Sequence, residues 1–89
     1  MLAQTDWILL LATLPARNTA TRMRLWRALK ALGCATLRDG VYLLPAREET
    51  AAALRAQAEE VHTAGGAAEV LHVAADGTQD AAFRALFDR

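Results

Sequence analysis

A run of basic residues is the feature of this sequence with the clearest potential for chemistry. Between residues 17 and 38 there are six basic residues and no acidic one, whereas the rest of the chain holds four basic and ten acidic residues. The six are Arg17, Arg22, Arg24, Arg27, Lys30 and Arg38. Because the net charge is zero, a positive segment is joined to an acidic remainder. Such asymmetry suits an anionic partner.

Part of this run predicts a DNA-binding helix. Capping side chains at 18–21 and Gly33 as a stop indicate a helix that runs from this capping segment to about Leu32. Its apolar positions at helical spacing are Leu25, Ala28, Leu29 and Leu32. Basic side chains recur on the opposite face, where they would neutralise phosphates and release counterions. The candidate DNA-binding residues are Arg22, Arg24, Arg27 and Lys30.

The start of the same helix could instead hold a small oxyanion. Cations in a first helical turn cost roughly 0.3–1 kcal/mol each unless an anion compensates them. Free backbone N–H groups, hydroxyls and guanidinium groups would supply the donors. The candidate oxyanion residues are Arg17, Thr19, Thr21, Arg22 and Arg38. An alternative is that these cations pair with the chain's own carboxylates, namely Asp39, Glu48, Glu49, Glu59 and Glu60.

No group of residues has the spacing of a metal or catalytic site. His62 and His72 are ten positions apart, with no cysteine or carboxylate at ligand spacing. Cys34 is the only cysteine, and no histidine or asparagine near it in the sequence could activate it as a nucleophile. Residues 12–15, which end the first expected strand, contain no carboxylate for metal-dependent phosphodiester cleavage. The sequence therefore predicts no cofactor, no metal and no enzymatic activity.

The elements that would position the basic run follow from hydropathy and turn residues. An apolar run at 7–14 is typical of a buried strand, and short strands around Asp39-Gly40 predict a hairpin. A second helix is expected over 47–64, and a fourth strand over 67–73. Thr78 or Asp80 could cap a last helix. The order indicates an α+β, ferredoxin-like βαββαβ fold with a four-stranded antiparallel sheet and an extra C-terminal helix.

The first strand is apolar on both faces, which is unusual for a sheet with one face in water. A second copy of the chain, a further domain or the last helix could cover the second face. We favour a second copy, which predicts a homodimer through that face. The apolar run of eight residues is too short to span a membrane and no export signal precedes it, so a cytoplasmic protein is expected. The 89 residues suit one domain, expected to be the N-terminal module of a longer protein.

Several segments together resemble the N-terminal domain of ChrB-type chromate-resistance regulators. They are WILLL at 7–11, LPARN at 14–18, RMRLWRALKALG at 22–33 and LRDGVYLLP at 37–45. The resemblance implies a cytoplasmic, chromate-sensing transcriptional regulator of a chromate-efflux operon, with a second domain after this one. It supplies no catalytic residue.

The sequence leaves several functions open. The favoured hypothesis is a domain that binds DNA and pairs with a copy of itself. The alternatives are an oxyanion sensor module that holds chromate and a purely structural dimerisation domain. A chromate reductase that uses the Cys34 thiol is favoured less.

Overall fold

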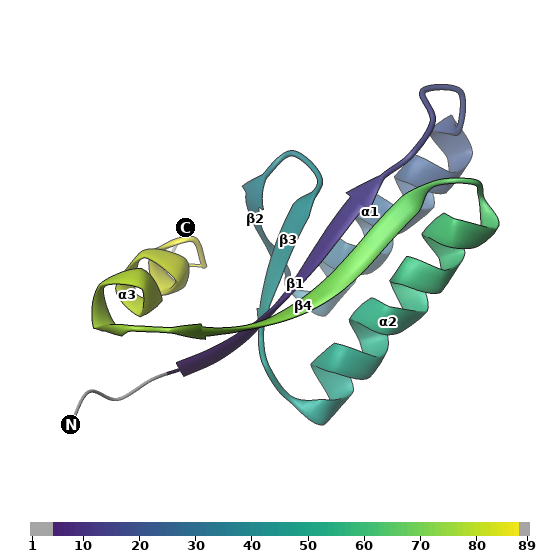
Figure 1. Ribbon diagram of the computed structural model, residues 1–89. Helices are drawn as coiled ribbons and strands as arrows, with labels where there is room; N and C mark the ends of the chain where they lie inside the picture. The colour runs from purple at the N-terminus through teal and green to yellow at the C-terminus, as the bar shows by residue number, and fades with distance from the viewer. Residues whose placement is uncertain (1–4, 88–89) are drawn as a thin grey trace.

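The computed structural model describes residues 5–87 as a sheet with three helices (Figure 1). The elements are β1 (Thr5–Thr13), α1 (Thr19–Leu32), β2 (Ala35–Arg38), β3 (Val41–Pro45), α2 (Glu48–Thr63), β4 (Ala67–Ala75) and α3 (Gly77–Ala85). The boundaries lie close to those predicted, except that β4 continues two residues beyond the expected end, where Ala74 and Ala75 pair with Asp6 and Thr5 of β1. No helix within 5–87 has the length and apolarity needed to cross a membrane.

The four strands form one antiparallel sheet in the order β2-β3-β1-β4. The long strand β1 lies in the middle, paired with β3 on one side and with β4 along its whole length on the other. This confirms the predicted ferredoxin-like α+β arrangement with an additional C-terminal helix. The β2–β3 hairpin turns at Asp39-Gly40, where Gly40 has a φ of 78°.

Helices α1 and α2 cover the first face of the sheet, side by side (Figure 1). The buried residues of that core are Ile8, Leu10, Leu25, Leu29, Leu44, Leu54, Ala58, Val61 and Ala68. Leu32, expected on the buried side of α1, is 38% exposed because it is the last residue of the helix.

The second face of the sheet has a smaller core at the Trp7 end, and α3 packs on it (Figure 1). Trp7 is 2% exposed, its indole donates to Asp80, and the rings of Phe83 and Phe87 lie against it. The last helix therefore covers part of the face that we assigned mainly to a second copy. The remaining part exposes Leu71.

The cap of α3 differs from the sequence prediction. Asp76, rather than Thr78 or Asp80, precedes the helix in an extended conformation, and its carboxylate accepts a 2.9 Å hydrogen bond from the backbone N–H of Gln79. Asp80 lies one turn further on, where it bonds to Trp7 instead.

Candidate functional site

The outer side of α1 carries three exposed cations. Arg24, Arg27 and Lys30 are all exposed, while Leu25 and Leu29 of the same helix are buried against the sheet. We call these three cations the basic stripe. They lie on one side of α1 because a spacing of three residues turns the helix by only about 60° from one cation to the next. The predicted separation of apolar and basic faces on this helix is confirmed.

The basic stripe has no internal counter-ions among residues 5–87. The ion pairs in that part of the chain are His72 with Asp6, at 3.4 Å, and Arg84 with Asp80, at 2.6 Å. None of the six basic residues between 17 and 38 takes part in one. The alternative that these cations are neutralised by the chain's own carboxylates is therefore wrong for the described residues.

The contacts that the stripe does make leave its charge available. The guanidinium of Arg24 donates to the hydroxyl of Thr21 at 3.4 Å. The ammonium of Lys30 lies 4.7 Å from the ring centroid of Trp26, a side chain that is itself 50% exposed. A cation–π contact at an exposed site contributes only about 0.5–1 kcal/mol and does not cancel the charge. Arg27 has no polar contact within the described residues.

The N-terminus of α1 has no acidic residue in its first turn. Asn18 precedes the helix but makes no capping hydrogen bond with its side chain; its amide donates to the backbone carbonyl of Ala64 at the end of α2. The positive end of the α1 dipole thus lies close to the cations Arg22 and Arg24, and the first turn of the helix supplies no carboxylate to compensate them.

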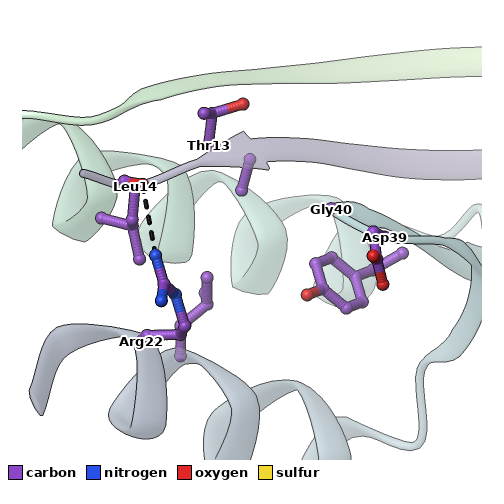
Figure 2. Close-up of a pocket in the computed structure, with 8 residues that line it drawn as sticks. Thr13, Leu14, Arg22, Asp39 and Gly40 are labelled. Atoms are coloured by element: carbon purple, nitrogen blue, oxygen red, sulfur yellow. Dashed lines mark hydrogen bonds between the residues drawn. The ribbon is translucent and has the colours of Figure 1, made fainter. Parts of the chain in front are cut away.

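Arg22 lies apart from the stripe. Its guanidinium donates to the backbone carbonyl of Leu14 at 3.3 Å (Figure 2) and to that of Pro15, also at 3.3 Å, and so joins α1 to the loop after β1. Of the four candidate DNA-binding residues, Arg24, Arg27 and Lys30 therefore lie together on α1. The fourth, Arg22, lines a neighbouring pocket.

That pocket has a volume of about 500 Å³ and lies between α1, the end of β1 and the β2–β3 hairpin (Figure 2). Its lining residues are Ala12, Thr13, Leu14, Arg22, Leu25, Asp39, Gly40 and Tyr42. Burial, followed by the negative charge of Asp39, raises the pKa of the Tyr42 hydroxyl, while Arg22 acts in the opposite direction. The pocket therefore presents a cation, an anion and a neutral phenol.

Sequence reasoning missed Asp39 and Tyr42 as pocket residues. Both belong to the hairpin, and the hairpin reaches the pocket because the backbone N–H of Ala12 donates to the carbonyl of Gly40 at 2.8 Å. The Asp-Gly turn predicted the hairpin but not the strand beside which it would lie.

The five candidate oxyanion residues are not gathered in this pocket. Arg22 is the one that lines it. Thr19 and Thr21 lie in the first turn of α1, Arg17 lies in the loop before it, and Arg38 ends β2. An oxyanion in the pocket would also meet the carboxylate of Asp39.

Cys34 does not have the environment of a reactive thiol. Partial burial raises the pKa of the thiol to about 11, so that it is protonated near neutral pH. It lines a cavity of about 170 Å³ with Trp26, Lys30 and Tyr42. Within residues 5–87 there is no group of three or more His, Cys, Asp or Glu side chains that could hold a metal ion.

The fold and this surface together define a small ferredoxin-like α+β domain whose first helix presents unpaired cations. Comparison with known proteins assigns it to a family. A family model described as "Protein ChrB, N-terminal" matches residues 22–89, so the chain belongs to this family, as the sequence motifs predicted.

A curated relative extends the match toward the N-terminus. The chain is 46% identical over 87 residues to Protein ChrB of Cupriavidus metallidurans, an alignment that covers 97% of this chain and 27% of that protein. The chain thus spans about a quarter of the length of this relative. No solved structure matches this chain.

Proposed function

We propose that this domain binds duplex DNA through the basic stripe, as part of a chromate-responsive transcriptional regulator. The observation that carries the proposal is that Arg24, Arg27 and Lys30 are exposed on one helix without an ion pair to any described residue. Membership in the ChrB N-terminal family supports the regulatory setting.

The geometry of the stripe suits a phosphate backbone. Residues three apart on a helix are separated by about 4.5 Å along its axis. That distance is comparable with the rise of about 3.4 Å per phosphate along one DNA strand. Arg24 and Arg27 can also bind phosphate oxygens with two parallel N–H groups.

We propose that the domain is a binding module rather than an enzyme. A thiol-dependent reductase would need a Cys34 thiolate at neutral pH, and the raised pKa of about 11 opposes it. Chromate binding by this domain remains a separate prediction. Ligand-induced thermal stabilisation that is lost in Arg17→Ala and Arg22→Ala would support it.

Fluorescence anisotropy with a labelled duplex of about 30 base pairs tests DNA binding as salt is varied. We expect Arg27→Glu to weaken binding and to reduce the salt dependence by about one phosphate contact. The triple variant Arg24→Glu, Arg27→Glu, Lys30→Glu should abolish binding.

The matched control is Arg55→Glu, which makes the same change in net charge at an exposed position of α2. It should keep most of the affinity. Equal losses for Arg27→Glu and Arg55→Glu, or DNA retention by the triple variant, would show that the stripe is not the DNA-binding surface.

A further inference from the structure

Two large apolar side chains lie exposed on the outer side of α1, among the cations of the basic stripe. Met23 is 43% exposed and Trp26 is 50% exposed, whereas the apolar residues on the opposite side of the helix are buried. Residues three and four apart on a helix are neighbours on its surface. Met23 is therefore next to Trp26 and Arg27, and Trp26 is next to Lys30. The outer side of α1 thus presents an aromatic ring and a thioether between positive charges.

Phosphate binding alone does not account for these apolar groups. Arginine and lysine side chains bind phosphate oxygens by charge and hydrogen bonds, to which an indole adds nothing. The Lys30 ammonium lies 4.7 Å from the ring centroid of Trp26, yet half of the Trp26 side chain remains exposed. An exposed aromatic ring among unpaired cations is the combination with which proteins bind single-stranded nucleic acids. The cations follow the phosphates, and the ring stacks on a base.

A small cavity lies beside Trp26, between α1 and the β2–β3 hairpin. Its volume is about 170 Å³, and its lining residues are Trp26, Leu29, Lys30, Cys34, Thr36 and Tyr42. Pockets for drug-sized ligands measure about 300–1,000 Å³, so this cavity suits a single ring system. The hydroxyls of Thr36 and Tyr42 make no hydrogen bond within residues 5–87. They are therefore available to the polar edge of such a ring.

The faces of nucleic-acid bases are accessible only when a strand is unpaired. In a duplex each base is stacked between its neighbours, and the grooves present base edges alone. A single strand, or a base turned out of a duplex, offers a face on which an indole can stack. The exposed ring of Trp26 therefore suits an unpaired base rather than a base pair.

We propose that Trp26 stacks on an unpaired base of a DNA strand and that this base enters the cavity beside β2. The contact rests on the proposed DNA binding, because Arg27 and Lys30 of the basic stripe bind the phosphates on either side of the base. Lys30 both lines the cavity and lies over the Trp26 ring, so its ammonium is close to a nucleotide held there. Every base has a face that can stack, so this contact tolerates any sequence.

Tryptophan fluorescence measures the contact directly, because Trp26 is exposed and Trp7, the other tryptophan, is buried. The probes are a single strand of about eight thymidine nucleotides and an abasic phosphodiester strand of the same length. We expect the thymidine strand to quench the emission of the unchanged chain and the abasic strand to leave it unchanged. In Trp26→Phe, where Trp7 is the only indole, the quenching should be lost.

Fluorescence anisotropy with the same strands measures the affinity. Trp26→Ala should weaken binding of the thymidine strand about 5- to 150-fold, which corresponds to the contribution of about 1–3 kcal/mol from one stacked base. The same variant should leave the affinity for a duplex nearly unchanged. Trp26→Phe keeps a ring and should lose less affinity. The matched control is Leu71→Ala, which removes an exposed apolar side chain from β4, the outer strand on the far side of the sheet from β2. It should bind the thymidine strand normally.

The outcomes separate this contact from the proposed duplex binding. Equal affinity for the thymidine and abasic strands, or thymidine binding that survives Trp26→Ala, would overturn the base contact. Duplex binding through the basic stripe without quenching by the thymidine strand would overturn the base contact alone. Thymidine binding that requires Trp26, in a chain that binds no duplex, would instead overturn the duplex proposal and support the base contact.

Discussion

The indole Nε1 of Trp7 donates a 2.9 Å hydrogen bond to Oδ1 of Asp80 and so joins β1 to α3 across 73 positions of the chain. Trp7 is 2% exposed, and the ring of Phe83 meets it edge-on with centroids 5.5 Å apart. The other carboxylate oxygen of Asp80 accepts from Nε of Arg84 at 2.6 Å. This group of contacts attaches α3 to the second face of the sheet.

Asp80→Ala should lower the free energy of unfolding by about 1.5–3 kcal/mol, because it leaves a buried indole N–H without its charged acceptor. Asp80→Asn, which keeps an acceptor oxygen, should cost less. Urea denaturation in a Trp26→Phe background, where Trp7 is the only fluorescent indole, measures both. Arg84→Ala is the control: its side chain is 63% exposed and lies 5.9 Å from the Trp7 ring centroid, and an i,i+4 helix pair contributes only about 0.3–0.5 kcal/mol. Equal small costs for Asp80→Ala and Arg84→Ala would show that the Trp7 hydrogen bond does not hold α3.

Gly40→Ala should destabilise the fold by about 1–3 kcal/mol through backbone strain alone. Gly40 has a φ of 78°, and a Cβ there would lie 2.7 Å from the carbonyl oxygen of Ala12. Gly77→Ala is the matched control: a Cβ at that position meets no atom within 4 Å, and the residue begins α3. We expect it to be neutral or to stabilise by about 0.4–1 kcal/mol. Thermal or urea denaturation of the two variants checks the difference in sign, and similar effects would contradict the close approach of the hairpin to β1.

The Cys34 thiol should react slowly with iodoacetamide at pH 8. Its pKa is raised from 9.0 to about 11 by burial, so its thiolate fraction is about a hundredfold below that of an unperturbed thiol. The rate should rise with pH toward 11. Because the folded state holds its proton more tightly than the unfolded state, the stabilisation from this thiol is complete below pH 9 and is lost as pH rises from 9 to about 11. Cys34→Ala should remove that part of the pH dependence in urea denaturation. A rate equal to that of a free thiol would contradict the burial.

The salt dependence of DNA binding should distinguish Arg22 from the stripe. Three phosphate contacts at about 0.9 each give a slope of log K on log salt near −2.7 for one domain. Arg27→Ala should reduce the magnitude of this slope by about 0.9, whereas Arg22→Ala should leave it unchanged because Arg22 bonds to the carbonyls of Leu14 and Pro15. Fluorescence anisotropy between low and moderate salt measures both slopes. An equal reduction by Arg22→Ala would place that residue in the DNA contact.

Local sequence signals were sufficient to predict the elements and the family. Helical spacing of Leu25 and Leu29, the stop at Gly33 and the Asp39-Gly40 turn act over a few residues, so they can be read without knowledge of the rest of the fold. The same periodicity placed Arg24, Arg27 and Lys30 on the outer side of α1. The cap of α3 was mispredicted because Asp76, Thr78 and Asp80 are all acceptable capping residues, and only the path of the chain selects one of them.

What the sequence determined by itself was the order of strands and helices, the two faces of α1 and the membership in the ChrB N-terminal family. Only the tertiary structure decided that α3 packs against Trp7 and that Arg22 lines the pocket beside Tyr42 instead of lying with the basic stripe. The strand register likewise decided that Arg38 and Glu69 lie on the two outer strands of the sheet. The physical reason is the distance along the chain. Propensity and periodicity act between near neighbours, whereas these relationships arise from strand register and packing between residues far apart in the sequence.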